Sequence, residues 1–253
     1  MKIALFADIH SNLEALQACL AHAEGQGAGM FVFLGDLVGY GADPVACLAL
    51  VAQYAERGAL LVRGNHDEAA LGGLAGNMNP LAREAIDWTR RQLGARDCAF
   101  LSALPMTARH GDLLFVHAGA RKPESWPYIY SGNQAKRCMD ATDAAICFVG
   151  HVHQQTLYWL PTPGLARVLT GAQVFTPTPG VPIPLARNRR WLAIVGSVGQ
   201  PRDGNCAAGY ALFEDESRML TFFRVSYDHQ SAARKILVAG LPGQLAEQLL
   251  DRE

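Results

Sequence analysis

A carboxylate and an imidazole follow the first apolar run of the chain at a spacing that suits metal binding. Asp8 and His10 lie two positions apart, directly after residues Ile3 to Ala7, which we expect to form a buried strand. Two ligands on one short piece of backbone can reach a common centre. A mixed set of oxygen and nitrogen donors is what zinc and related divalent metals bind.

Further donors of the same kind lie just past later apolar runs. They occur in Gly35-Asp36, Gly64-Asn65-His66-Asp67, Val116-His117-Ala118-Gly119 and Gly150-His151-Val152-His153. A single histidine after a strand is more often a hydrogen-bonded structural residue than a ligand, but five such coincidences favour one site. Together with Asp8 and His10, the expected ligands are Asp36, Asn65, His117, His151 and His153. Seven ligands exceed the need of one tetrahedral zinc, so we expect two ions that share a carboxylate; a mononuclear zinc hydrolase is the alternative count.

The elements around these residues indicate a parallel or mixed sheet. Apolar runs at residues 30–34 and 59–62 alternate with expected helices at 13–25 and 43–57. The first helix is expected to begin with a capping box formed by Ser11 and Glu14. Such alternation places the chemistry in loops at the carboxyl ends of the strands.

The rest of the chain is expected to be more varied. We expect helices at residues 80–94, at 133–141 and from Asp228, a hairpin at 106–116, and strands at 145–149, 191–195, 210–213 and 220–225. The last three strands would close a second sheet. Residues 161–184 hold six of the 13 prolines, which excludes a long helix and favours short edge strands and turns. The Gly-rich residues 71–79 are expected to form a loop.

Length and composition favour one cytoplasmic domain over residues 1–253. Half of the residues are apolar, which is enough for a large core, and the net charge of −1 gives no electrostatic case for a nucleic-acid or membrane surface. The six cysteines are widely spaced, without a Cys-x-x-Cys motif, which indicates a reduced compartment. The first apolar run is too short for a signal peptide, and no run of roughly 18 apolar residues could cross a bilayer.

The ordered motifs Asp-x-His, Gly-Asp, Gly-Asn-His-Asp, Val-His-Ala-Gly and Gly-His-x-His resemble those of the calcineurin-like metallophosphoesterase superfamily, over roughly residues 1–155. The resemblance implies an α/β (α+β) fold: a four-layer αββα sandwich, with two mixed β-sheets face to face and helices on both outer sides. It assigns Asp8, His10 and His153 to one metal, Asn65, His117 and His151 to a second, and Asp36 to both. It makes His66 the general acid.

The expected activity is hydrolysis of a small phosphorylated substrate: a phosphodiester, a phosphomonoester or a nucleotide. Two divalent ions (Mn, Fe, Zn, Ni or Co) lower the pKa of a bridging water and neutralise phosphate oxygens, so that the metal-bridging hydroxide attacks in line. His66 would protonate the departing alkoxide, a step typically worth about 10²- to 10⁴-fold. The other interpretation of His66 is a supporting or merely exposed histidine. Asp67 could orient His66 or cap the following segment.

Two departures from the family pattern affect the substrate. In serine/threonine protein phosphatases of this superfamily, an Asp-Arg pair follows the Gly-Asp motif, supports the catalytic histidine and grips phosphate. Gly39-Tyr40 stands there in this chain, which weakens that interpretation and leaves His66 without its usual partner. Tyr40 could stack on an aromatic or nucleoside leaving group, or pack at the rim.

A late segment supplies a second candidate for phosphate binding. Residues 196–203 resemble the Gly-Ser...Pro-Arg segment of small bacterial phosphodiesterases in the superfamily. Arg202 could replace the missing phosphate grip or hold the second sheet through an ion pair. The alternative function from another class is a non-catalytic, metal-binding interaction scaffold of the same fold, which predicts loss of the ligands or of the acid.

Overall fold

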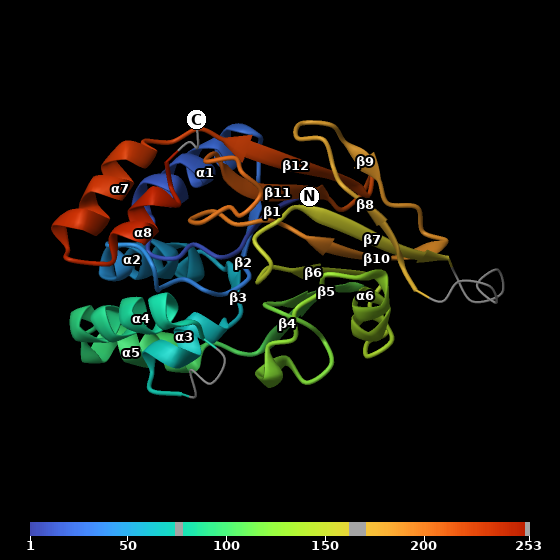
Figure 1. The fold of residues 1–253 in the computed structure, drawn as a ribbon. Helices are drawn as coiled ribbons and strands as arrows, with labels where there is room; N and C mark the ends of the chain where they lie inside the picture. Colours follow the sequence, from blue (N-terminus) through green and yellow to red (C-terminus); the bar gives the residue numbers. More distant parts are fainter. Residues whose placement is uncertain (74–77, 162–170, 251–253) are drawn as a thin grey trace.

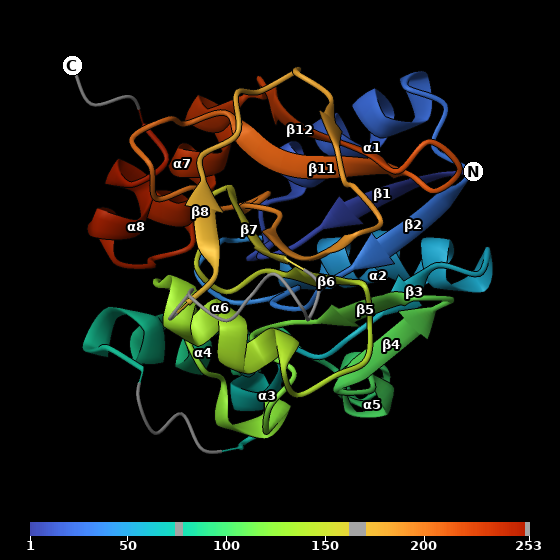
Figure 2. The ribbon, with the colours of Figure 1, turned by 90° about the vertical axis from the view of Figure 1, so that its right-hand side faces the viewer.

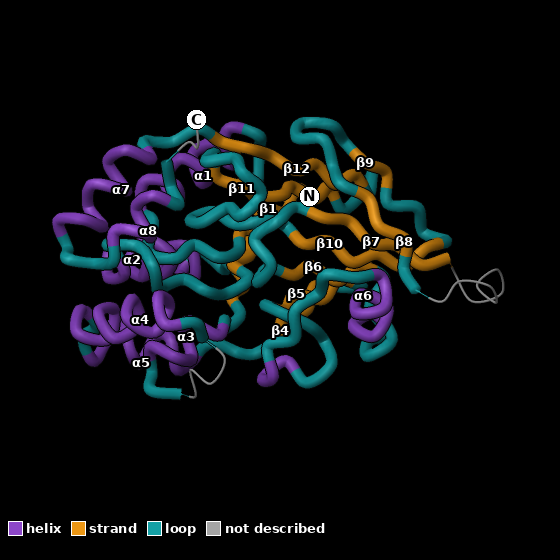
Figure 3. The backbone as a smooth tube through the Cα atoms, viewed as in Figure 1, coloured by secondary structure: helices purple, strands orange, loops and turns teal. Residues whose placement is uncertain are grey.

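Two β-sheets packed face to face form the centre of the molecule (Figure 1). The structure is a computed structural model and describes residues 1–73, 78–161 and 171–250. Among these residues, no helix is both long and apolar enough to span a membrane. Figure 3 shows the strands gathered on one side of the view and most helices on the other.

The first sheet has the strand order β3-β2-β1-β11-β12-β9. Its strands are β1 (Lys2–Phe6), β2 (Met30–Phe33), β3 (Leu60–Leu61), β9 (Ile183–Pro184), β11 (Ala208–Glu214) and β12 (Met219–Val225). The first three strands are parallel, as expected of strands joined by helices. β11 pairs antiparallel with both β1 and β12, so the C-terminal strands complete the sheet that the N-terminal strand begins.

The second sheet has the order β4-β5-β6-β10-β7-β8. Its strands are β4 (Thr107–His110), β5 (Leu113–Val116), β6 (Ile146–Val149), β7 (Thr156–Pro161), β8 (Gln173–Phe175) and β10 (Arg189–Ile194). The expected 106–116 hairpin is present, since β4 and β5 pair antiparallel. The expectation that residues 191–195 join 210–213 and 220–225 was wrong: β10 pairs with β6 and β7 in this sheet, while β11 and β12 belong to the other.

Helices cover both outer faces, so the four-layer sandwich is confirmed. α1 (Leu13–Gly25) and α2 (Pro44–Glu56) pack on the first sheet, and α6 (Gly132–Met139) packs on the second. Strand alternation divides the core: Ala4 and Phe6 of β1 face the helices, whereas Ile3 and Leu5 face the other sheet. Figure 2 shows the two sheets from the side that carries β8.

The remaining helices gather largely at one end of the sandwich (Figure 1). They are α3 (Asn65–Ala70), α4 (Pro80–Gln92), α5 (Ala95–Ala103), α7 (His229–Val238) and α8 (Gly243–Glu247), with a 3₁₀ turn at Pro123–Ser125. The sequence did not predict α3 or α5. α5 begins beside Gly94, where the backbone N–H of Gly94 donates to Asp97 Oδ2, so a break that ends one helix also starts the next.

Two local expectations need correction. α1 is capped by Asn12 rather than Ser11: Asn12 Oδ1 accepts the N–H of Ala15 at 3.1 Å, while Ser11 has a left-handed φ of 54°. Of the proline-rich stretch, residues 162–170 lie outside the described residues, and β8 and β9 are the short edge strands that were expected. Residues 74–77 of the expected Gly-rich loop also lie outside them.

The contact between the sheets predicts a large stability effect for Phe148. Its ring is fully buried, with its centroid 5.8 Å from that of Phe115 in the same sheet and 5.5 Å from that of Phe213 in the other. Phe148→Ala is expected to lower the free energy of unfolding by about 3–5 kcal/mol. The control Phe175→Ala, 46% exposed on β8, is expected to change it by less than about 0.5 kcal/mol. Equal losses in urea denaturation would contradict this placement.

Candidate active site

All seven predicted metal ligands lie together where strands of both sheets end. Asp8 and His10 follow β1, Asp36 follows β2, and Asn65 begins α3 just after β3. From the second sheet, His117 follows β5, and His151 and His153 follow β6. Asn65 is half-buried, and the other six side chains are buried. The chain thus places polar, ionisable groups inside the molecule, which is costly unless they bind or neutralise one another.

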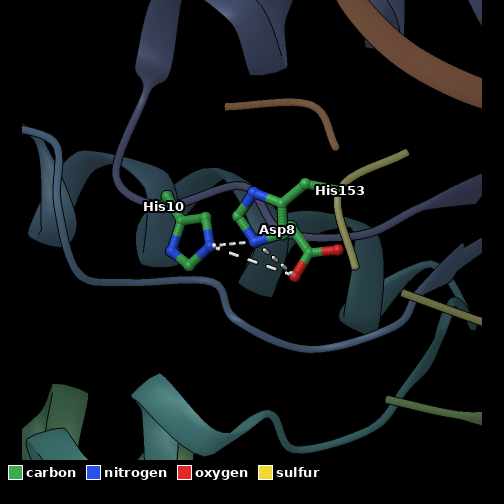
Figure 4. A group of neighbouring side chains, drawn as sticks. All are labelled: Asp8, His10 and His153. Carbon is green, nitrogen blue, oxygen red and sulfur yellow. Dashed lines mark hydrogen bonds and ion pairs between the residues drawn. The ribbon is translucent and has the colours of Figure 1, made fainter. Parts of the chain in front are cut away.

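Asp8, His10 and His153 form the first half of the cluster (Figure 4). Asp8 Oδ1 lies 3.3 Å from His153 Nε2 and 3.9 Å from His10 Nε2, and the two Nε2 atoms are 3.1 Å apart. Figure 4 shows these atoms pointing toward one another. Residues separated by more than 140 positions therefore face a common centre.

Asp36, His117, His151 and Asn65 form the second half. His117 Nε2 lies 3.2 Å from His151 Nδ1 and 3.0 Å from Asn65 Oδ1. Asp36 Oδ2 is 3.4 Å from His117 Nε2 and 3.7 Å from His10 Nε2. One oxygen of the Asp36 carboxylate therefore lies between the two halves of the cluster, as the prediction of a ligand common to both ions requires.

Backbone carbonyls orient three of the histidines. His10 Nδ1 donates to the carbonyl of Val38 at 3.2 Å, His117 Nδ1 to that of Leu34 at 2.7 Å, and His153 Nδ1 to that of Gln200 at 2.6 Å. Each bond fixes the proton on Nδ1 and leaves the Nε2 lone pair free for a metal. These partners could not be predicted from the sequence, because every residue carries a carbonyl.

The facing ring nitrogens fit divalent cations. When the rings are neutral, with the proton on Nδ1, His10 Nε2 and His153 Nε2 are both acceptors, and so are His117 Nε2 and the Asn65 oxygen that faces it. Acceptors at about 3 Å repel each other unless a cation or a proton lies between them. Imidazole nitrogens and carboxylate oxygens are the donors that Zn, Mn, Fe, Co and Ni bind.

Burial favours the neutral, metal-binding form of several imidazoles. It lowers the pKa of His151 to about 3 and that of His66 to about 4, with neighbouring histidine charges acting in the same direction. For His117, burial acts in the same sense but is outweighed by the Asp36 carboxylate, which raises the pKa to about 9. Asp36 shows the converse effect: burial raises its pKa, but cationic His117 and its neighbours hold the pKa well below the ordinary value.

The backbone of the cluster is strained. Five of the seven predicted ligands have a left-handed φ: Asp8 (53°), His10 (49°), Asp36 (52°), His151 (68°) and His153 (66°). This conformation costs residues other than glycine roughly 1–2 kcal/mol each and is concentrated at functional sites. The abrupt turn after each strand is what aims its side chain into the centre.

Backbone amides hold the two carboxylates. The N–H of His151 donates to Asp8 Oδ2 at 2.9 Å, and the N–H of His66 donates to Asp36 Oδ1 at 2.8 Å. Gly64 must lack a side chain, because a Cβ there would collide with Asp36 Oδ1. One oxygen of Asp36 is thus bound by backbone while the other faces the histidines.

Asp67 caps a helix and does not orient His66. Its Oδ2 accepts the N–H of Gly64 at 2.9 Å at the start of α3, and its Oδ1 accepts that of Leu37 at 2.8 Å. The carboxylate therefore fastens the loop after β2, which carries Asp36, to the start of α3. Of the two roles open from the sequence, the structure supports the cap.

His66 stands beside the cluster against Tyr40. Its ring centroid is 4.7 Å from that of His10 and 4.6 Å from that of Tyr40. His66 Nδ1 is buried and has no hydrogen-bond partner among the described residues, and a Cβ at Gly39 would collide with it. Tyr40 is only 7% exposed and packs against both imidazoles, so it seats His66, and it also belongs to the lining of the cleft that opens onto the cluster.

Arg202 is exposed at the edge of the same site. One of its Nη atoms lies 3.4 Å from Tyr40 Oη and 3.4 Å from Gln200 Oε1. The ion pair of this segment is made instead by Asp203 with Arg224. Arg202 has no carboxylate partner among the described residues, so its charge faces the site.

A cleft of about 820 Å³ opens onto the cluster. Its lining includes Asp36, His66, His151 and Arg202, and also Trp126 and Tyr128 from the segment between β5 and α6. The sequence reasoning gave these aromatic residues no role. The available signal was the alternation of Trp126, Tyr128 and Tyr130, three aromatic residues in an irregular segment.

Comparison with known proteins places the chain in a family. Residues 1–155 match the calcineurin-like phosphoesterase family. A metallophosphoesterase from Sphaerobacter thermophilus has a similar structure, with a TM-score of 0.85 and 37% identity over 98% of each chain. An uncharacterised protein of Methanocaldococcus jannaschii is 32% identical over 98% of this chain and 96% of its own length. The Pyrococcus horikoshii protein PH1004 shares the fold, with a TM-score of 0.77 at 18% identity over 99% of this chain and 98% of its own. The chain therefore belongs to the calcineurin-like phosphoesterase family.

Proposed function

We propose that the chain is a dinuclear metal-dependent phosphohydrolase that acts on a small phosphodiester, phosphomonoester or nucleotide. The proposal depends mainly on one observation: two groups of facing donor atoms meet at Asp36 Oδ2, which lies between His10 and His117. Asp8, His10 and His153 would hold one ion, and Asn65, His117 and His151 the other. Asp36 would contact both.

Divalent cations bound there would neutralise the charge of a phosphate group and activate a water for in-line attack. The protein would contribute position and protons. Arg202 lines the cleft and has no carboxylate partner in the part of the chain that the structure describes, so its guanidinium can bind phosphate oxygens. His66 adjoins the donor cluster and can protonate the leaving oxygen.

His66 has to gain its proton when the substrate binds. Burial lowers its pKa to about 4, so the ring is neutral near pH 7 before an anion arrives. A phosphate group beside the ring favours the cationic form, because opposite charges stabilise each other. Tyr40 and Gly39 keep the ring in place, while His66 Nδ1 has no carboxylate partner within residues 1–73, 78–161 and 171–250; a carboxylate serves this role in the serine/threonine protein phosphatases.

The direct test is hydrolysis after metal reconstitution. Protein stripped with a chelator and reloaded with Mn, Fe, Zn, Co or Ni is expected to hydrolyse p-nitrophenyl phosphate, bis-p-nitrophenyl phosphate or both, with two ions bound per chain. Ion content is measured by mass spectrometry and activity by nitrophenolate release. Full loading with no turnover of either ester would contradict the proposal and would favour the scaffold function. One ion per chain with full activity would favour a mononuclear enzyme.

Asp36→Asn is expected to loosen both ions and to lower kcat at least about 100-fold, because the shared carboxylate becomes a neutral amide. Glu124→Gln is the matched control, since it makes the same change at another carboxylate in the lining of the cleft. The control is expected to keep its ions and activity. If Asp36→Asn retained both ions at wild-type affinity, the shared role would be wrong.

His66→Gln is expected to keep both ions and to lower kcat by about 10²- to 10⁴-fold for esters with an alkyl leaving group, because a poor leaving group needs the proton. The loss for p-nitrophenyl esters should be much smaller, since nitrophenolate leaves without help. The comparison of these two rates with the measured ion content separates the acid role from metal binding. Loss of the ions in this variant would make His66 a ligand.

Gly39→Ala tests whether the packing of His66 against the backbone at position 39 is needed for activity. The new methyl group would collide with His66 Nδ1, so this variant is expected to show the leaving-group dependence of His66→Gln with the ions retained. Gly58→Ala is the matched control: Gly58 has the same φ of 92°, but nothing lies within 4 Å of its Cβ position. The control carries the backbone strain alone and is expected to keep full activity. Equal kinetic effects in the two variants would argue against the proposed role of Gly39 in positioning His66.

A further inference from the structure

Two aromatic side chains line one wall of the cleft, and a third packs on the wall from beside it. Trp126, Tyr128 and Tyr130 alternate along the irregular segment that joins β5 to α6. Trp126 and Tyr128 line the cleft, and Tyr130 packs on Tyr128. Tyr128 is 42% exposed and Tyr130 is 61% exposed. Large rings left this open beside a polar site are typical of a surface that contacts a ligand.

The rings form a stack that leads outward from the donor cluster. Tyr128 lies nearly parallel to the imidazole of His151, with ring centroids 3.9 Å apart and 22° between the planes. Tyr130 continues the stack, at 5.3 Å from Tyr128 and 8° between the planes. A planar group joined to a phosphate at the cluster would therefore meet this aromatic stack as it leaves the centre.

Another part of the cleft, at Arg202, carries a positive charge, whereas the aromatic wall is uncharged. The guanidinium of Arg63 in the lining is paired with Glu68 at 2.8 Å, which leaves Arg202 as the cation facing the cleft without a carboxylate partner among the described residues. Tyr40 also lines the cleft but is only 7% exposed, far less than Tyr128. A charged phosphate end and an uncharged planar end are thus suited to different parts of the same cleft.

We propose that the natural substrate is a phosphate ester of a nucleoside, whose base stacks on the wall formed by Trp126, Tyr128 and Tyr130. This inference rests on the proposed phosphohydrolase function and specifies its substrate class. A cleft of about 820 Å³ is larger than a phenyl phosphate needs and lies toward the upper end of the range typical of small-molecule and cofactor sites. Because Tyr130 extends the stack beyond Tyr128, the wall suits a base held away from phosphorus by a sugar.

The test compares ligands that differ only in the base. Adenosine 5′-monophosphate and ribose 5-phosphate are titrated calorimetrically into metal-reconstituted protein. The wild-type protein is expected to bind the nucleotide about 10-fold more tightly, which corresponds to about 1.4 kcal/mol and agrees with one stacked base. Phenyl phosphate, which has a ring but no sugar, is expected to bind more weakly than the nucleotide.

Variants connect the difference in affinity to the wall. Tyr130→Ala is expected to remove the preference for the nucleotide, and Tyr130→Phe is expected to keep it. Phe175 is an exposed aromatic residue outside the cleft, so Phe175→Ala is expected to leave the preference unchanged. Tyr130 contacts no predicted metal ligand in its stack, so its variants should retain their ions, which is checked by mass spectrometry. Tyr128→Ala is also expected to remove the preference for the nucleotide while keeping ribose 5-phosphate affinity, provided its ion content is unchanged.

The failure of this inference is distinct from the failure of the proposed function. Equal affinities of the wild-type protein for the nucleotide and ribose 5-phosphate would overturn the stacking wall, even if phosphate esters were hydrolysed. Phenyl phosphate binding as tightly as the nucleotide would assign the wall to small aryl esters and overturn the nucleoside. If no ester were hydrolysed while the nucleotide preference followed Tyr130, the proposed hydrolysis would fail and the binding inference would stand.

Discussion

The rest of the structure is built around a buried cluster of nitrogen and oxygen atoms that face one another at close range. His10 Nε2 and His153 Nε2 are 3.1 Å apart, and His117 Nε2 faces both His151 Nδ1 and the amide oxygen of Asn65 at similar distances. Each ring is held in this position by a bond from its other nitrogen or by its backbone. A fold that buries such a set gains from cations at the centre, since their binding replaces repulsion with coordination.

The two-sheet sandwich supplies the rigidity that this arrangement needs. Left-handed backbone at five predicted ligands costs free energy, and the cost is offset by a core of apolar side chains between and outside the sheets. The segment after β10 ties the sheets together at the site: Val198 N–H donates to the carbonyl of Ala7, and Gln200 supplies the carbonyl that orients His153. The crossing of β10 into the second sheet is therefore what brings this segment to the cluster.

His66 and the cleft show how one family scaffold can be adapted. A glycine at position 39 gives room to the imidazole, and the ring of Tyr40 packs against it at a tilt. Arg202 contacts Tyr40 from a segment more than 160 residues later. The aromatic segment from Trp126 to Tyr130 lines another part of the cleft. The predicted metal ligands and the residues proposed to contact the rest of the substrate thus belong to different segments of the chain.

The sequence by itself determined the donor set and most of the strands that carry it, because apolar runs ending in Asp, Asn and His are local patterns that need no knowledge of the fold. It also showed that position 39 lacks a carboxylate. Tertiary structure alone decided which sheet receives β10, which carbonyls orient the histidines, and that Tyr40 is buried while Tyr128 is exposed. These depend on contacts between distant segments and on backbone groups common to all residues, so no local pattern encodes them.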